Sequence, residues 1–232
     1  MSGNAKLFIG LTIVAGSLIL VGCVVSSETF ADLAIYVSCF ALALLSSALK
    51  VRLPGITGTI STNFLFVLIS TAIFTLTETV VLASVACLVQ CVWRAKRRPK
   101  PVQVLFNVSV LAISSGVTYR LSHLLVRVNH TNLPVLLAVA ACLYFTSNTF
   151  LVAGVLSLVD DKPLMQVWRQ CYLWSFPYYL AGAAIAGLVV TTGQTVGWAM
   201  SLLILPIMYL VYVFYGMFVE HFGDRTASSG TI

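Results

Sequence analysis

Long apolar segments alternate with short polar ones along nearly the whole chain. The apolar segments lie at about 7–25, 30–49, 62–77, 79–93, 102–119, 133–159, 172–191 and 197–219. Because a helix rises about 1.5 Å per residue, each can cross, or nearly cross, the roughly 30 Å of hydrocarbon in a bilayer. Membrane β-strands are shorter and alternate in polarity. The pattern therefore predicts an all-α fold, a polytopic bundle of about eight membrane spans.

The stretch 62–93 is ambiguous, because it fits either one long helix or a hairpin of two short ones. Positively charged loops stay on the cytoplasmic side of a membrane, and five of the chain's 13 Lys and Arg residues lie in the next segment, 93–101. With a cytoplasmic N-terminus, a hairpin that turns at Thr77–Thr79 returns this basic loop to the cytoplasm, whereas one long helix does not. Only Arg120 and Arg127 then lie outside. We therefore predict the hairpin, eight spans and two cytoplasmic termini.

The composition agrees with a membrane protein. The chain is 59% hydrophobic and 9% charged, whereas soluble domains carry roughly 25% charged residues. We expect one transmembrane helical domain over 1–222 and a polar C-terminal tail over 223–232. The net charge of +6 comes mostly from the predicted cytoplasmic loops. We therefore expect this positive charge to face membrane lipids with anionic headgroups. We expect no nucleic-acid partner.

The polar stretch 52–59 cannot be the interior of a helix. Pro54 lacks an amide donor, and Gly55 and Gly58 permit positive φ. At a membrane edge, irregular backbone is tolerated where it is buried in protein or faces water. We expect a loop that packs back on the bundle.

Glu78 is the one carboxylate within the predicted hairpin. An ionisable side chain inside a membrane is costly and needs a partner. Two alternatives are open: Glu78 caps a helix at the tip of the hairpin, or it contacts a ligand or a proton.

Other polar and aromatic side chains form stripes inside the later spans. Gln103, Asn107, Ser114 and Thr118 share one helix face, Tyr144 and Asn148 form an i, i+4 pair, and Trp174, Tyr178 and Tyr179 begin the next span. Such residues either line a cavity for a small amphipathic ligand or join helices by hydrogen bonds. The ligand alternative predicts a site formed by Glu78, Asn107, Asn148, Trp174 and Tyr178.

Small residues form one face of the span at 172–191. They are Gly182, Ala183, Ala186 and Gly187. Such a face lets another helix approach closely. The approaching helix belongs either to the same chain or to a second copy, in which case the face is a homodimer seam.

The chain shows no arrangement typical of an enzyme. His123, His130 and His221 are far apart in the sequence, and no catalytic Ser-His-acid, zinc-protease or phosphate-loop motif is present. Cys87 and Cys91 share a helix face, but no nearby histidine or carboxylate completes a metal site. We expect no enzymatic activity, no cofactor and no metal.

Two motifs are the most specific in the chain: LVQCVWRAKRRPKPVQVLFN at 88–107 and YLWSFPYYL at 172–180. Together with KVRLPGITGT at 50–59 and SNTFLV at 147–152, they resemble the N-terminal multi-span membrane domain of bacterial HD-GYP and GGDEF proteins, which handle cyclic di-GMP. In those proteins the membrane domain precedes a cytoplasmic phosphodiesterase or cyclase domain. Here the polar tail takes that place, so the resemblance implies the input half alone.

The resemblance implies a stand-alone sensor module in the bacterial cytoplasmic (inner) membrane. Such a module binds a small or lipidic ligand in its bundle, or responds to the bilayer, and signals through a cytoplasmic partner. The alternative function is a solute-binding or transport protein, similar in kind to the substrate-binding subunits of vitamin importers. A transporter moves its solute across the membrane, whereas a sensor binds without flux.

Overall fold

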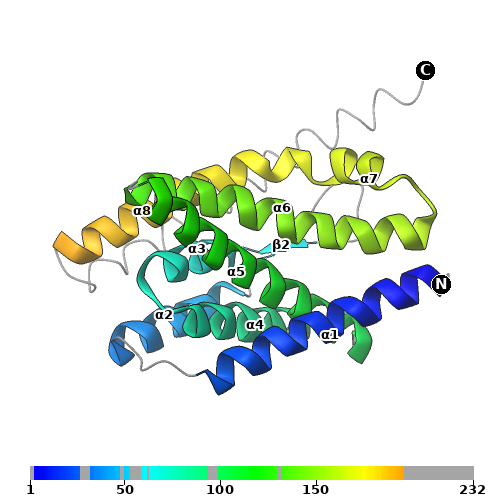
Figure 1. Ribbon diagram of the computed structural model, residues 1–232, viewed down its shortest axis with the longest axis horizontal. Coiled ribbons are helices and arrows are strands. Elements are labelled where there is room, and N and C mark those ends of the chain that lie inside the picture. The colour runs from blue at the N-terminus through cyan, green and yellow to red at the C-terminus, as the bar shows by residue number, and fades with distance from the viewer. Residues whose placement is uncertain are drawn as a thin grey trace.

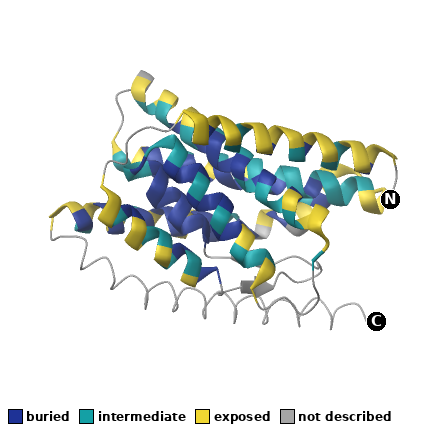
Figure 2. Ribbon diagram, turned by 90° about the horizontal axis from the view of Figure 1, so that it is seen from below, coloured by how far each residue is buried: buried dark blue, intermediate teal, exposed yellow. Residues whose placement is uncertain are grey.

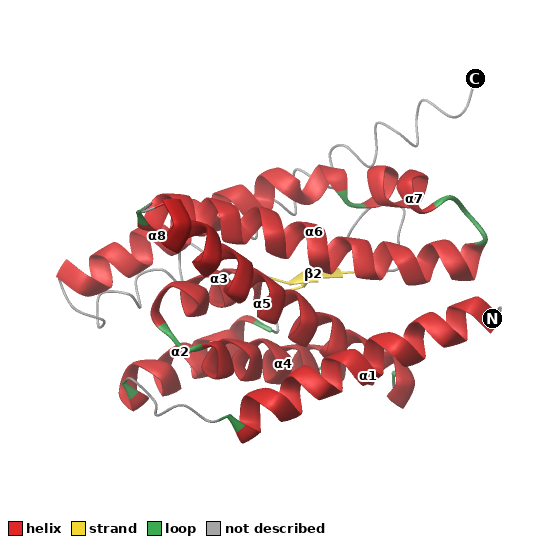
Figure 3. Cartoon of the chain, in the orientation of Figure 1, coloured by secondary structure: helices red, strands yellow, loops and turns green. Residues whose placement is uncertain are grey.

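The computed structural model describes residues 3–26, 32–47, 50–52, 59–61, 63–93, 99–129 and 132–195 (Figure 1). Within these ranges the chain is helical apart from one short two-stranded ribbon (Figure 3). The predicted helical class is therefore confirmed. The predicted span at 197–219, the polar tail and the basic residues at 94–98 lie outside the described residues.

Four of the described helices are long and apolar enough to cross a membrane. They are α1 (Gly3–Val25), α5 (Pro101–Asn129), α6 (Leu133–Asp160) and α8 (Phe176–Thr195). Each coincides with a predicted span, although α5 continues beyond the predicted end at residue 119. The apolar run stops there, but Arg120 and its neighbours still favour a helix.

Three further apolar helices are shorter than a span. They are α2 (Leu33–Ser46), α3 (Asn63–Ile73) and α4 (Leu76–Val92). At about 1.5 Å per residue, α3 extends only about 16 Å, roughly half the hydrocarbon thickness. A helix this short does not cross the hydrocarbon alone, whereas α4, at about 26 Å, nearly does.

Helices α3 and α4 form the predicted hairpin. The Asn63 side-chain amide at the start of α3 donates to Gln90 Oε1 near the end of α4, at 3.3 Å. The two outer ends of the pair are therefore neighbours, and the chain reverses between them. The turn lies at Phe74–Thr75, before the predicted Thr77–Thr79, because Thr75 begins α4 as its N-cap.

The stretch predicted as an irregular loop contains a small antiparallel ribbon instead. Strand β1 (Lys50–Arg52) pairs with β2 (Thr59–Ser61), with Lys50 opposite Ser61. β-Branched residues in both strands favour extended backbone. The intervening residues 53–58 lie outside the described ranges.

A short helix, α7 (Leu164–Cys171), and a 3-10 turn, η1 (Leu173–Ser175), connect α6 to α8. The Trp168 indole N–H donates to Thr149 Oγ1 at 2.9 Å and ties α7 to α6. The predicted span at 172–191 therefore begins as an α-helix only at Phe176.

Helix α3 lies at the centre of the bundle. Every residue from Asn63 to Thr71 is buried, and α3 contacts α2, α4, α5, α6 and α8. Figure 2 shows the buried residues gathered in the middle of the molecule and exposed residues on the outer helices. The hairpin thus places one arm where the rest of the chain encloses it.

The small-residue face of α8 is covered within the chain. A Cβ on Gly182 would collide with the Phe64 ring of α3. Ala183 and Ala186 are buried, and Leu137 of α6 lies against Gly187. This arrangement agrees with the close-packing alternative for Gly182, Ala183, Ala186 and Gly187.

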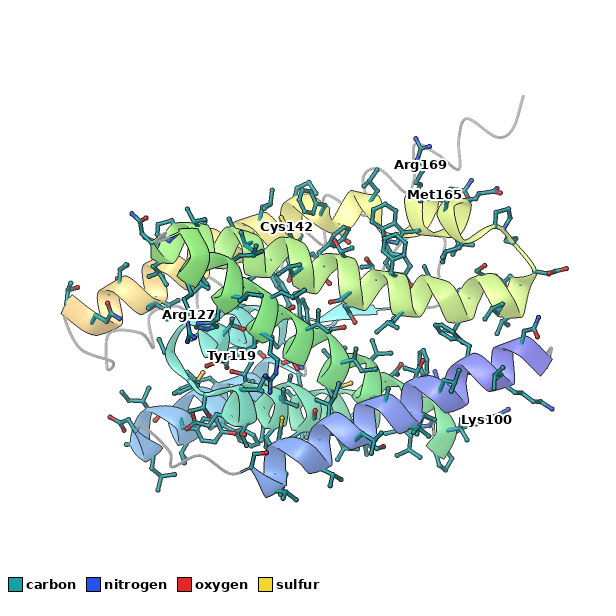
Figure 4. The ribbon with its side chains drawn as sticks, viewed as in Figure 1. Lys100, Tyr119, Arg127, Cys142, Met165 and Arg169 are labelled. Atoms are coloured by element: carbon teal, nitrogen blue, oxygen red, sulfur yellow. The ribbon has the colours of Figure 1, made fainter. Side chains whose placement is uncertain are left out.

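The bundle has two distinct ends. Lys100 and Arg169 lie towards the end that carries the N-terminus, whereas Arg127 lies towards the opposite end (Figure 4). We call the former the basic end. The turn of the hairpin lies at the opposite end, because Thr77 Oγ1 of α4 donates to the carbonyl of Cys23, near the C-terminus of α1, at 3.1 Å.

Candidate functional site

The α3–α4 hairpin carries a polar cluster at each of its two ends. The first cluster lies at the base of the hairpin, where it joins α3 to α4. We call Ser46, Ser47, Asn63 and Gln90 the hairpin base. Asn63 Oδ1 accepts from Ser46 Oγ at 2.9 Å and from Ser47 Oγ at 3.1 Å. The Asn63 amide donates to Gln90 Oε1, and Ser47 Oγ also reaches the carbonyl of Ala86 at 3.2 Å. Three helices thus share one hydrogen-bond network.

The hairpin base is well shielded from solvent. Asn63 is only 7% exposed, and both serines are buried. Buried polar groups are costly unless they are hydrogen-bonded, and here each side chain has partners on another helix. The sequence pattern does not indicate this cluster, because isolated Ser and Asn residues in apolar runs form no helical stripe.

The second cluster, at the turn, is built around Glu78. Thr75 and Glu78 form a capping box. The Thr75 N–H donates to Glu78 Oε2 at 2.8 Å, and Thr75 Oγ1 donates to the same oxygen at 2.9 Å. The partial positive charge of a helix N-terminus also favours a carboxylate there. The capping alternative for Glu78 is therefore confirmed for Oε2.

Neighbouring helices hold the turn in place. The Tyr36 hydroxyl of α2 donates to the backbone carbonyl of Glu78 at 3.3 Å. His123 Nε2 of α5 lies 2.8 Å from the carbonyl of Thr71, near the end of α3. Since a carbonyl only accepts, Nε2 carries the proton in this contact. The end of α3 thus gains a partner for one of its free carbonyls.

Capping uses only one of the two Glu78 oxygens. Five buried side-chain oxygens in the described part of the chain have no hydrogen-bond partner: Glu78 Oε1, Thr79 Oγ1, Ser84 Oγ, Ser114 Oγ and Thr118 Oγ1. All five belong to α4 and α5, and we call these residues the α4–α5 seam. Because buried polar groups in proteins normally have partners, the α4–α5 seam is the place where the fold leaves polar groups free for something else.

The structure separates two of the predicted site residues. Asn107 donates to Cys91 Sγ of α4 at 3.5 Å. Cys91 follows Glu78 by 13 positions in the same helix, which corresponds to about 20 Å along its axis. Asn107 therefore lies near the base of the hairpin and Glu78 at its turn.

The remaining predicted residues lie elsewhere in the bundle. Asn148 is half-buried on α6. Tyr178 is buried with its ring centroid 4.9 Å from that of Phe64, and the side chain of Trp174 lies outside the described part of the structure. The predicted set thus does not form one cluster, and a ligand role for each member stays a prediction.

The described residues contain no group of three His, Cys, Asp or Glu side chains that could hold a metal ion. Cys87 and Cys91 form no disulfide in the described part of the chain. The chemistry available at the turn is therefore that of one carboxylate oxygen and several hydroxyls.

Comparison with known proteins gives one match. A family model, MASE9, matches residues 25–217. The match includes α2 to α8, and thus the hairpin and its two polar clusters. No curated protein and no solved structure matches the chain.

Proposed function

The chain belongs to the MASE9 family, whose members are membrane-associated sensory domains, and from this premise we propose that it is the input module of a membrane signalling system. In this proposal the module binds a ligand inside the bundle and passes the change to a cytoplasmic partner. Apolar helices of membrane-spanning length support the membrane setting.

One observation carries the proposal: the hairpin is enclosed by the bundle, and its two ends differ in hydrogen bonding. A ligand shifts a conformational equilibrium only by binding one arrangement better than another. At the α4–α5 seam a ligand would supply partners that the chain itself does not supply. At the hairpin base the chain already supplies them.

A route from the turn to the cytoplasm runs along α4. This helix continues from the turn to Val92, and the basic loop at 93–101 follows it. Displacement of α4 against α5 would therefore move the five positive charges of this loop. In the proposal, these charges face anionic lipid headgroups or a partner protein in the cytoplasm.

The topology can be tested directly. In the proposal both termini and the basic loop are cytoplasmic, and the turn faces the outside of a bacterial inner membrane. Reporter fusions at Lys100 and at the C-terminus should report the cytoplasm, and a fusion at Glu78 should not. A periplasmic signal at Lys100 would contradict the topology.

Ligand binding is tested by thermal-shift screening of the purified full chain against lipids and small metabolites. The variants Glu78→Gln and Asn107→Ala serve as a matched pair, because the two residues lie near opposite ends of α4. A hit lost only in Glu78→Gln acts at the turn, and a hit lost only in Asn107→Ala acts near the base. Without any saturable hit, the ligand-binding part of the proposal fails.

Transport is the second candidate function. The turn between α3 and α4, which the bundle encloses, favours it, because irregular backbone at membrane depth is tolerated where it lines a water-filled cavity. The test is uptake of a screening hit into proteoliposomes that contain the chain. Accumulation inside the vesicles would favour transport, and binding without accumulation would favour sensing.

A further inference from the structure

We propose that the last part of α5 binds the headgroup of an anionic phospholipid through Arg120 and Arg127, in the leaflet at the end of the bundle opposite the basic end. We call residues 119–127 the α5 extension. The proposal deepens the proposed function and rests on it, because it names a class of ligand for the sensory module. Lipid binding is nevertheless measurable without any signalling partner.

The length of α5 places the α5 extension beyond the hydrocarbon. From Pro101 to Arg127 the helix has 27 residues, which corresponds to about 40 Å, whereas the hydrocarbon is roughly 30 Å thick. Lys100 immediately precedes α5 at the basic end (Figure 4), so the helix begins near the membrane edge there. The remaining length of about 10 Å equals the rise from Arg120 to Arg127. The two arginines therefore lie at the level of the phospholipid headgroups.

The side chains of the α5 extension divide into an exposed half and a covered half. At about 100° per residue, Arg127 lies only about 20° around the helix from Arg120, and both side chains are exposed. Leu121, Leu124 and Leu125 are also exposed and lie between about 40° and 140° from Arg120. The covered half lies between about 200° and 300° and carries Tyr119, Ser122, His123 and Val126. The two arginines and the three leucines thus share one continuous surface.

The positive charge of this surface is not neutralised by the described part of the chain. Neither Arg120 nor Arg127 forms a hydrogen bond or an ion pair there. The described carboxylates at this end of the bundle have other roles, since Asp32 is the N-cap of α2 and Glu78 is buried in its capping box. The first turn of α6, which follows α5, contains no acidic residue. An anionic ligand would therefore find two free guanidinium groups.

The exposed leucines favour a lipid over a soluble anion. Leu121, Leu124 and Leu125 are 41%, 56% and 44% exposed, on the same short segment as the two arginines. An apolar strip beside a basic one is typical of helices at a membrane interface, where apolar side chains contact acyl chains and long basic side chains reach the headgroups. A phospholipid supplies both contacts, whereas a soluble anion supplies only the second.

The guanidinium groups favour an anionic phospholipid over a zwitterionic one. Arginine binds phosphate oxygens through its planar fork of N–H donors. In a zwitterionic lipid the headgroup cation offsets the phosphate charge, whereas an anionic lipid keeps it. Two free arginines therefore favour a headgroup with net negative charge.

The covered half of the α5 extension contacts the hairpin. His123 Nε2 lies 2.8 Å from the carbonyl of Thr71 in α3, and the Tyr119 ring lies against the His123 ring, with centroids 4.4 Å apart. The segment that holds the lipid is thus joined to the end of α3. A lipid that binds one position of the α5 extension better than another would bias the position of α3.

The experiment is photo-crosslinking of the purified full chain in phosphatidylcholine nanodiscs. Two matched probes, phosphatidylglycerol and phosphatidylcholine, carry the same photoreactive group in an acyl chain. Mass spectrometry measures the ratio of the two crosslinks on peptides of the α5 extension, with peptides of the lipid-exposed helix α1 as the internal reference. We expect phosphatidylglycerol to be preferred about 30-fold at the α5 extension, because each basic residue near an anionic surface contributes about fivefold.

The test variant is Arg120→Gln/Arg127→Gln, which removes both positive charges from the α5 extension. The matched control is Lys100→Gln/Arg169→Gln, which removes two positive charges from the basic end (Figure 4). The preference at the α5 extension should disappear in the test variant and remain in the control. Excess inorganic phosphate, compared with chloride at the same ionic strength, should leave it unchanged.

Equal crosslinking by the two probes in the wild-type chain would overturn the proposal. A preference that persists in the test variant would also overturn it, because the arginines would then not be the ligands. Loss of the preference in inorganic phosphate would replace the lipid with a soluble anion. If the double variant does not fold, the two single variants decide. Each of these failures leaves the metabolite screen of the proposed function unaffected, because that screen reports on ligands inside the bundle.

Discussion

The base and the turn of the α3–α4 hairpin are both buried and polar, but they differ in how their hydrogen bonds are satisfied. At the base, Asn63 joins three helices, and its amide and the neighbouring hydroxyls all have partners. At the turn, Glu78 uses one oxygen for capping and leaves the other free. In the proposed function, the base is fixed and a ligand completes the turn.

The difference also predicts which substitutions lower the stability of the chain and which change its response to a ligand. A fully bonded buried network rigidifies a bundle, whereas unsatisfied buried groups cost free energy until something binds them. Substitutions at the base should therefore lower the stability of the chain. Substitutions at the seam should change its response to ligands more than its stability.

The largest effect is expected where α3 packs against α8, because the position of α3 determines where both polar clusters lie. Gly182→Leu would force α8 away from Phe64, and overpacking of this kind costs about 3 kcal/mol. Thermal unfolding in nanodiscs should show a clear drop in Tm. Gly187→Ala is the control, because its added Cβ would meet Leu137 at an ordinary 3.5 Å. Equal drops in both variants would contradict the close contact between α3 and α8.

The next effect concerns the base. Asn63→Leu removes the partner that Ser46, Ser47 and Gln90 share, and should cost about 2 kcal/mol. Asn148→Leu is the control, since Asn148 is only half-buried and outside this network. The two free energies of unfolding should differ clearly. If Asn63→Leu unfolds like the wild-type chain, the base is not the anchor that we infer.

At the turn, the expected sign depends on the substitution. Glu78→Gln keeps an acceptor for the capping box and removes a buried charge, so without ligand it should stabilise the chain by about 1 kcal/mol. Glu78→Ala loses the capping bonds and should destabilise the chain by about 1 kcal/mol. Chemical or thermal unfolding of the two variants checks the signs. A loss of stability in both would mean that capping alone explains Glu78.

The smallest effect compares the same substitution in the two clusters. Ser84→Ala removes a hydroxyl without a partner and should leave Tm unchanged. Ser47→Ala removes a hydroxyl bonded across helices and should cost about 0.6 kcal/mol, typical for such bonds in membranes. Side-by-side melting curves provide the measurement. A larger loss for Ser84→Ala would place an unrecognised bond at the seam.

The sequence predicted the hairpin because charge placement depends only on which loops are basic. For Glu78 it left capping and a ligand contact open, and the capping box shows that Oε2 caps the turn. The structure separates Asn107 from Glu78 for a reason that the hairpin already contained. Asn107 of α5 follows the basic loop and lies beside the end of α4, whereas Glu78 lies at the start of α4, at the turn.

Other features required the three-dimensional structure. The base joins Ser46, Asn63 and Gln90, which lie in three separate apolar runs, and no local pattern pairs them. The seam depends on the register between α4 and α5, because Thr118 and Ser115 look alike in the sequence but differ in their hydrogen bonds. Periodicity identifies a helix face but not the group opposite it.

The central claim, that the turn responds while the base stays fixed, is tested most directly by amide hydrogen exchange. The full chain in nanodiscs is compared with and without a saturating ligand from the thermal-shift screen. We predict slower exchange with the ligand bound for peptides covering 74–79 and 112–120, and unchanged exchange for those covering 43–47, 63–67 and 86–90. Equal slowing in both groups, or slowing at the base alone, would contradict the account.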